Sequence, residues 1–96
     1  SGKRQDAIDL ANCYISSLEL AKKNNIHTIA FPAISTGHYG YPAKAAADIA
    51  LETITKWLDT NRNYVMSVII CCYDAKMYDV YKGNGNGNDN EPNQRD

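Results

Sequence analysis

Two nearly uninterrupted apolar runs, separated by a helix-like segment, limit the folds that this chain can adopt more than any other feature. The first run covers residues 26–34 and the second, rich in β-branched residues, covers residues 64–73. Neither run alternates cleanly between apolar and polar residues, which is typical of strands covered on both faces of a parallel sheet. Parallel strands need a crossover connection, and a helix between them supplies it. The sequence therefore predicts an α/β fold.

The first helix is predicted over about residues 4–24, where apolar residues recur at helical spacing. Its predicted apolar face consists of Ile8, Ala11, Ile15, Leu18 and Ala21. Asn24 and Asn25 end this segment, because Asn accepts the left-handed backbone that often follows a helix. Glu19 and Lys23 have the spacing of a favourable ion pair.

Two further helices complete the predicted order helix–strand–helix–strand–helix. One covers about residues 43–59, and a proline just before it favours the first turn. Its apolar stripe consists of Ala46, Ile49, Ala50, Ile54, Trp57 and Leu58. The other covers residues 75–82, with Asp74 placed to cap its N-terminus. Pro32 cannot donate to a strand ladder, so the first strand should end close to it.

The folded part is predicted over residues 3–82, and residues 83–96 form a tail rich in glycine and asparagine. The tail contains no residue that could anchor a core. It cannot offset the entropy cost of its own ordering, and we expect it to be disordered.

Charge and cysteine content narrow the classes of function. The chain of 96 residues has a formal net charge of −1, which argues against a broad nucleic-acid-binding surface. No apolar run is long enough for a membrane span. Three cysteines give no disulfide framework, which favours a reducing compartment. We expect a cytoplasmic protein, with the nucleus left open.

The segment Ile34–Pro42 is the candidate ligand site. It joins the carboxyl end of the first strand to the second helix, which is the edge where open α/β sheets bind ligands. Free N–H groups at a helix N-terminus attract phosphate, and Gly37 and Gly40 let backbone approach a ligand closely. Hydroxyl and aromatic side chains around them suit a diphosphate with sugars attached. An ordinary glycine-containing turn is the alternative.

This segment resembles a known family. Residues 31–42 read F-P-A-I-S-T-G-H-Y-G-Y-P and precede an alanine-rich helix, which is similar to the second ligand loop of macrodomains. The segment L-A-N-C-Y-I-S-S-L-E-L-A of the first helix is also similar, as is Cys72-Tyr73-Asp74, with which the second strand ends. The resemblance covers residues 6–82. It implies a three-layer α/β/α fold, of which this chain holds the C-terminal portion.

Macrodomains bind ADP-ribose, and the resemblance implies a set of ligand-binding residues. The loop would wrap the diphosphate and the distal ribose, largely through backbone N–H groups. The ring of Tyr73 would lie against adenine, with Asp74 beside it. Gly37 and Tyr39 are candidates for positioning the substrate, and no catalytic side chain is identified. The implied ligand-binding set is Ile34, Ser35, Thr36, Gly37, His38, Tyr39, Gly40, Tyr73 and Asp74.

The loop with Tyr39 is similar to that of macrodomains that hydrolyse ADP-ribosyl esters. The resemblance implies activity on O-acetyl-ADP-ribose or on acidic side chains that carry mono-ADP-ribose. An ordered water near the ligand phosphate would attack the ester, which is catalysis by positioning. We expect no cofactor. The alternatives are a non-catalytic reader of ADP-ribose and an inactive fragment of a split or truncated domain.

The N-terminal half of a macrodomain, with several strands and a glycine-rich first loop, has no counterpart in this sequence. We expect the chain to need that half, or self-association, to fold well, because an open sheet edge invites pairing. ADP-ribose or an ADP-ribosylated substrate is the other expected partner, and nucleic acid and membranes are not.

The remaining chemistry-bearing residues are expected to be structural. His38 beside a diphosphate could add charge-assisted binding, but a solvent-facing role is preferred. His27 opens a strand as a surface or hydrogen-bonded residue. Cys13, Cys71 and Cys72 are expected in the core. The spacing of histidines and cysteines fits no metal-binding motif, so no metal is expected.

Overall fold

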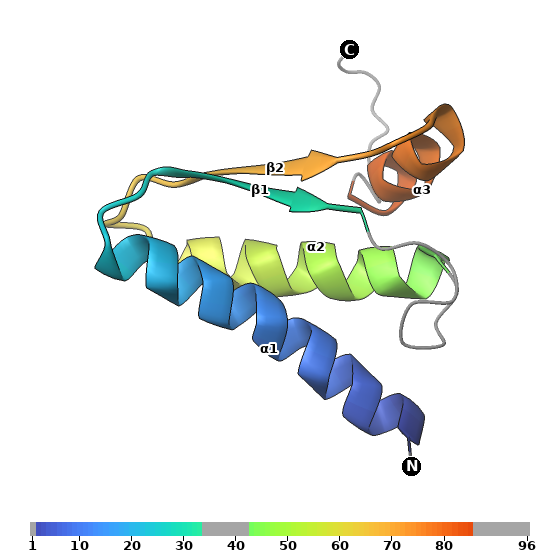
Figure 1. Ribbon diagram of the computed structural model, residues 1–96, viewed down its shortest axis with the longest axis horizontal. Helices are drawn as coiled ribbons and strands as arrows, with labels where there is room; N and C mark the ends of the chain where they lie inside the picture. The colour runs from blue at the N-terminus through green and yellow to red at the C-terminus, as the bar shows by residue number, and fades with distance from the viewer. Residues whose placement is uncertain (1, 34–42, 86–96) are drawn as a thin grey trace.

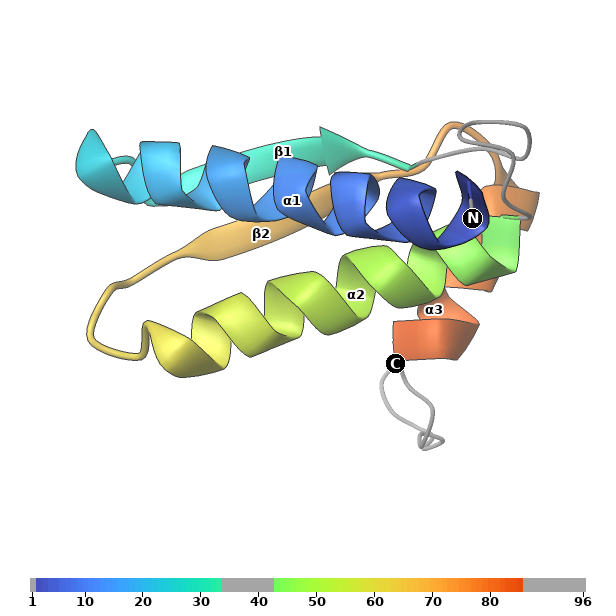
Figure 2. The ribbon, with the colours of Figure 1, turned by 90° about the horizontal axis from the view of Figure 1, so that it is seen from below.

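The computed structural model describes residues 2–33 and 43–85, and its elements follow the predicted order. They are α1 (Gly2–Lys23), β1 (Thr28–Pro32), α2 (Ala43–Thr60), β2 (Ser67–Cys71) and α3 (Ala75–Gly85). The two strands lie side by side, α1 and α2 lie on one face of their sheet, and α3 lies at the end to which both strands point (Figure 1). Seen from below, both long helices lie in front of the strands (Figure 2).

The strands pair in parallel, as the crossover argument predicts. Their register runs from Thr28 opposite Ser67 to Pro32 opposite Cys71. Each strand is shorter than its apolar run, and β1 ends at Pro32. The N–H of the next residue, Ala33, still donates to Cys71, so the missing N–H of Pro32 falls on the edge of β1 that faces away from β2. The parallel α/β arrangement is the predicted fold class.

The end of α1 is a Schellman motif built on asparagine. Asn25 has a φ of 58°, in the left-handed region. The N–H of Ile26 donates to the carbonyl of Ala21 at 2.9 Å, and the N–H of Asn25 donates to that of Lys22 at 3.1 Å. These two bonds satisfy carbonyls that the helix leaves unpaired, which confirms the predicted termination.

The buried face of α1 is rotated from the predicted one. Its buried side chains are Leu10, Tyr14, Leu18 and Ala21. Ile8 and Ile15, expected in the core, are exposed instead. The rotation brings Tyr14 edge-on against Phe31 of β1, with ring centroids 5.0 Å apart. Apolar residues lie on both the buried and the exposed side of this helix, Leu10 and Leu18 on one and Ile8 and Ile15 on the other. Helical periodicity alone could therefore not predict which side is buried.

The buried face of α2 agrees with most of the predicted stripe. Its buried residues are Ala46, Ala47, Ala50, Ile54 and Trp57, while Ile49 and Leu58 are only partly buried. The indole N–H of Trp57 donates to the carboxylate of Glu19 on α1 at 2.6 Å. Glu19 is therefore engaged across the helix pair, and within the described residues its predicted partnership with Lys23 does not form.

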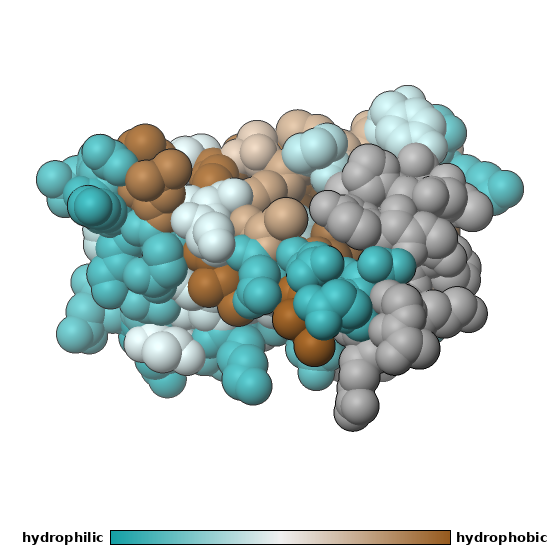
Figure 3. Space-filling model, turned by 60° about the horizontal axis from the view of Figure 1, so that its bottom comes forward, coloured by the Kyte–Doolittle hydropathy of each residue, from teal (hydrophilic) through white to brown (hydrophobic). Residues whose placement is uncertain are grey.

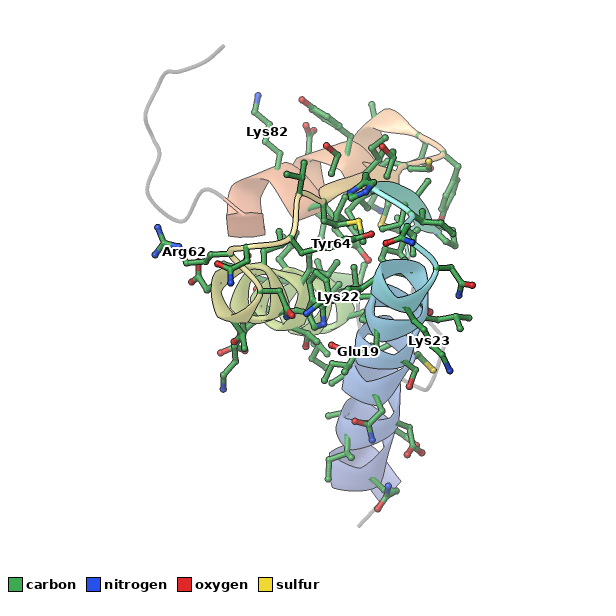
Figure 4. The ribbon with its side chains drawn as sticks, turned by 90° about the vertical axis from the view of Figure 1, so that its left-hand side faces the viewer. Glu19, Lys22, Lys23, Arg62, Tyr64 and Lys82 are labelled. Carbon is green, nitrogen blue, oxygen red and sulfur yellow. The ribbon has the colours of Figure 1, made fainter. Side chains whose placement is uncertain are left out.

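At the end of the molecule that holds the C-termini of α1 and α2, further contacts join the segments that end and follow these helices (Figure 4). The ammonium of Lys22 donates to the side-chain oxygen of Asn61 at 2.7 Å. The hydroxyl of Tyr64 donates to the carbonyl of Ile26 at 2.6 Å. His27 stacks on the Tyr64 ring, with centroids 4.7 Å apart. These contacts hold the starts of both strands beside the helix ends.

The last helix, α3, packs Met77 and Tyr81 into the core formed by the other helices. It ends at Gly85, so residues 83–85, assigned to the tail by the sequence, are helical. The predicted disorder of residues 86–96 lies outside the described part of the chain.

Only one face of the sheet is covered by the described chain, although the apolar runs predicted cover on both. The side chains of Ile29, Phe31, Val68 and Ile70 pack against the helical core. The residues between them are exposed, so burial alternates along both strands. On the opposite, helical side of the molecule, hydrophilic residues lie around apolar patches (Figure 3). None of the described helices is long and apolar enough to cross a membrane.

Candidate functional site

The carboxyl ends of β1 and β2 meet at one edge of the sheet. Beyond the last ladder pair, the N–H of Ala33 donates to the carbonyl of Cys71 at 2.9 Å. The first strand therefore leaves the sheet directly beside residues 72–74, which leave the second strand. The N-termini of α2 and α3 lie at the same end (Figure 1). This is the edge at which α/β sheets bind ligands.

Tyr73 and Asp74, the two predicted ligand-binding residues within the described chain, lie at this edge with different roles. The side chain of Tyr73 is 67% exposed, so its ring is free to meet a ligand. The carboxylate of Asp74 accepts a hydrogen bond from the N–H of Met77 at 2.8 Å. Asp74 is thus the predicted N-cap of α3, and one of its oxygens is already engaged.

The rest of the predicted site lies outside the described residues. It comprises Ile34, Ser35, Thr36, Gly37, His38, Tyr39 and Gly40. The described flanks show where this segment begins and ends. Ala33 is buried and hydrogen-bonded at the carboxyl end of the sheet, and Ala43 opens α2.

Sequence reasoning missed Ala33 as an anchor of the site. Its bond to Cys71 sets the point at which the predicted loop leaves the sheet. The signal in the sequence is weak: Ala33 is a small apolar residue at the end of the first apolar run, where it can stay buried.

The cysteines are less buried than the sequence predicts. Cys13 and Cys71 are exposed, and Cys72 is half-buried, so the expectation that all three belong to the core is wrong for the first two. Cys71 belongs to the uncovered face of β2, while Cys72, directly after the strand, is half-buried. Burial raises the pKa of the Cys72 thiol, and the neighbouring Cys71 and Asp74 raise this pKa further.

No cluster of three metal-ligating side chains forms within residues 2–33 and 43–85. The imidazole of His27 is exposed and hydrogen-bonded, as expected, because its Nδ1 lies 2.6 Å from the carbonyl of Val65. Two shallow hollows on the described surface lie away from the sheet edge. One follows the outer side of α2 from Asp48 to Asp59, and the other follows α1 from Ser16 to Lys23.

The fold and the position of the exposed aromatic residue define an α/β domain of the kind that binds ligands at the carboxyl edge of a parallel sheet. The family model described as Macro domain matches residues 1–50. The chain belongs to the macro domain family.

Relatives of known name match most of this chain and a smaller part of themselves. ADP-ribose glycohydrolase MACROD2 from Homo sapiens is 53% identical over 74 residues, which are 77% of this chain and 17% of the relative. O-acetyl-ADP-ribose deacetylase from Klebsiella pneumoniae is 47% identical over 81 residues, which are 84% of this chain and 46% of the relative. The chain thus spans less than half the length of either relative.

Solved macrodomains share the arrangement of the elements. The Trypanosoma brucei macrodomain in complex with ADP-ribose is similar with a TM-score of 0.72 at 36% identity, over 79% of this chain and 33% of that one. The Oceanobacillus iheyensis macrodomain with ADP is similar with a TM-score of 0.70 at 44% identity, over 78% of this chain and 38% of that one. These structures confirm the macrodomain-type α/β fold.

Proposed function

We propose that this chain contributes the second ligand loop and the adenine-side aromatic residue of an ADP-ribose-binding site. With the remainder of a macro domain present, that site hydrolyses ADP-ribosyl esters, either O-acetyl-ADP-ribose or mono-ADP-ribosylated acidic side chains. Support comes from relatives named as an ADP-ribose glycohydrolase and an O-acetyl-ADP-ribose deacetylase.

The observation that carries this proposal is the hydrogen bond between Ala33 and Cys71. It makes the start of the predicted loop and the Tyr73 segment neighbours at one edge of the sheet. A single extended ligand can therefore reach both. If the adenine of a ligand stacks on Tyr73, the diphosphate of the same ligand would extend toward the loop. There the N-terminus of α2 favours negative charge.

The proposed roles divide between backbone and side chains. Gly37 lets the loop backbone approach the diphosphate, and Tyr39 packs against the distal ribose and positions the ester. Tyr73 stacks on the adenine, and Asp74 fixes the start of α3 beneath it. Catalysis then rests on holding the ester against an ordered water, in the sense of positioning two reactants.

Calorimetric titration with ADP-ribose tests the binding step. The titrated protein is this chain combined with the part of the Klebsiella deacetylase that the chain does not match. Gly37→Val should abolish binding, because the added side chain would occupy the space that the diphosphate needs. Tyr73→Ala should weaken binding about tenfold, since base stacking on an aromatic side chain contributes about 1–3 kcal/mol. Tyr73→Phe should retain it.

The matched control is Tyr78→Ala, which removes another exposed tyrosine, from α3. Its affinity should stay within about twofold of the unchanged chain, as expected for a surface position away from a site. Equal losses in the Tyr73 and Tyr78 variants would contradict the assigned adenine contact.

A non-catalytic reader of ADP-ribose is the second candidate function. It is separated by activity, because a reader binds ADP-ribose without releasing acetate from O-acetyl-ADP-ribose. If neither binding nor release occurs with the remainder of the domain present, the chain is an inactive fragment and both functions fail.

A further inference from the structure

The end of the molecule opposite the candidate site exposes apolar and basic side chains together. It lies where α1 and α2 end and both strands begin (Figure 1). In Figure 4, which looks onto this end, Lys23 extends on the α1 side, Arg62 on the α2 side, and Lys22 lies between them. We call this surface the basic end; its members are Leu20, Lys22, Lys23, Ile26, Arg62 and Val65, all exposed.

The apolar members of the basic end come from two neighbouring loops. The N–H of Ile26 donates to the carbonyl of Ala21 at 2.9 Å, which folds Ile26 back onto the last turns of α1, where Leu20 lies. Val65 follows from the other loop, because its carbonyl lies 2.6 Å from Nδ1 of His27. Leu20, Ile26 and Val65 are 62%, 47% and 74% exposed. Exposed apolar side chains that gather between polar ones mark an interaction surface.

The charges of the basic end all have one sign. Residues 20–27 and 60–66 carry three basic side chains and no acidic one. The nearest acidic residues along the chain are directed elsewhere, because Glu19 accepts the indole N–H of Trp57 at 2.6 Å and Asp59 lines the hollow on the outer side of α2. The helix dipole accounts for the two lysines in the last turn of α1, but not for the exposed apolar side chains beside them.

Hydrogen bonds fix the shape of the basic end. The hydroxyl of Tyr64 donates to the carbonyl of Ile26 at 2.6 Å, and the ammonium of Lys22 donates to Asn61 at 2.7 Å. The N–H of Tyr64 donates to the carbonyl of Asn61 at 2.9 Å, which folds the chain after α2 into a turn. A partner therefore meets a preorganised surface, and association loses less entropy than it would on flexible loops.

Two other kinds of anionic partner fit this surface less well. Clusters that recognise anionic lipids contain about four to eight Lys and Arg residues, and the basic end has three. Single-stranded nucleic acid stacks its bases on aromatic rings. The aromatic ring at this end, that of Tyr64, is already stacked on His27, with centroids 4.7 Å apart. Aliphatic side chains among cations suit a protein partner better.

We propose that the basic end is a docking surface for an acidic amphipathic helix of a partner protein. Apolar side chains of that helix cover Leu20, Ile26 and Val65, and the shallow hollow on α1 beside them takes one more. Its carboxylates pair with Lys23 and Arg62, in the complementary sense that positions a partner. Because the surface lies opposite the ligand edge, docking leaves that edge open. The proposal stands apart from the proposed function.

Fluorescence anisotropy with a labelled peptide tests the docking. The probe contains leucine and glutamate at the spacing of an amphipathic helix. One comparison peptide has lysine in place of glutamate, and another has serine in place of leucine. The protein is this chain combined with the part of the Klebsiella deacetylase that it does not match. The probe should bind at least about tenfold more tightly than either comparison peptide, and its binding should weaken as salt is added.

Charge substitutions locate the binding. Val65→Glu should weaken it at least about tenfold, because it removes an apolar contact and places like charges together. Lys23→Glu should weaken it at least about threefold. The matched controls, Ile8→Glu on α1 and Lys76→Glu on α3, are exposed positions away from this end and should change it less than about twofold. Circular dichroism checks folding, and if Val65→Glu unfolds the protein, Lys23→Glu decides.

Four results would overturn the proposal. The first is that the probe does not bind, or binds no better than the lysine peptide. The second is that the variants and their controls lose equal affinity. The third is that the probe binds the chain alone but not the combined protein, because the rest of the domain would then occupy the surface. The fourth is that Val65→Glu abolishes binding to phosphatidylserine vesicles or a dimeric mass in light scattering, which would identify a membrane or a second copy as the occupant.

Discussion

The two faces of the sheet are made by the same strands and meet different environments. Ile70 points into the helical core, and its neighbour Ile69 points to the uncovered face of the sheet, the open face, which the exposed residues of β1 and β2 form. Cys72 and Cys71 repeat this contrast two residues further on. Both faces are apolar, yet the described chain covers only one of them. The difference teaches that the apolar character of a strand does not determine which of its faces is covered within the described residues.

The covered face should dominate the stability of the isolated chain. Leu18 is fully buried, and Leu18→Ala should lower the free energy of unfolding by about 3 kcal/mol through lost burial and a cavity. Urea denaturation followed by circular dichroism measures it. Leu20→Ala, on the same helix at 62% exposure, should cost less than about 0.5 kcal/mol. Similar losses would mean that α1 does not pack as described.

Two adjacent isoleucines compare the faces directly. In the isolated chain, Ile70→Ala should cost about 2 kcal/mol and Ile69→Ala less than about 1 kcal/mol, because only Ile70 packs on the core. Once the open face is covered, the cost of Ile69→Ala should rise toward that of Ile70→Ala. Thermal unfolding of both variants, with and without the remainder of the domain, measures this change. Equal costs in the isolated chain would remove the contrast.

The N-cap contact of α3 tests whether a stabilising interaction on the covered side is independent of what lies on the open face. Asp74→Ala should cost about 1 kcal/mol, since the N–H of Met77 loses its acceptor. Asp74→Asn should retain most of the stability. Asp79→Ala, in the same helix, is the control. Because this contact lies within the described chain, denaturation should give the same cost whether or not the open face is covered.

The adjacent thiols give the smallest effect. The raised pKa of Cys72 means that less of its thiol is ionised at a given pH, so maleimide labelling should be slower than for the same cysteine in the unfolded chain. The labelling rate in the folded chain should continue to rise with pH after the rate in the unfolded chain has levelled off. Mass spectrometry of peptides separates Cys72 from Cys71. Identical pH profiles in folded and unfolded chains would contradict the half-buried position of Cys72.

Local signals predicted most of the fold. Asn25 marked the end of α1, Pro32 the end of β1 and Asp74 the start of α3, because each residue type has its own backbone preference or hydrogen bond. The parallel pairing followed from the helix between the strands. These features depend on a few neighbouring residues, which the sequence shows directly.

Features that depend on packing were harder to predict. The face of α1 was rotated, because Tyr14 meets Phe31 of a strand that is distant in sequence. The uncovered face was missed because a strand that is apolar on both sides does not show what covers it. Of the candidate site, Tyr73 and Asp74 lie just after β2, at the carboxyl end of the sheet. Their contact with a ligand, and the loop that contains Gly37, stay predictions.

The contacts at the end of the molecule opposite the candidate site have a consequence for sequence change. Four hydrogen bonds there join residues 38 or 39 positions apart: Glu19 to Trp57, Lys22 to Asn61, Ile26 to Tyr64 and His27 to Val65. Together these bonds close one loop of chain, between residues 19–27 and residues 57–65. Once one bond has formed, the others add little further loss of chain entropy. Doubling the length of a flexible loop costs only about 0.6 kcal/mol. Insertions in the predicted ligand loop, residues 34–42, should therefore cost little stability. The sequence of this loop can then vary while the four hydrogen bonds hold the fold.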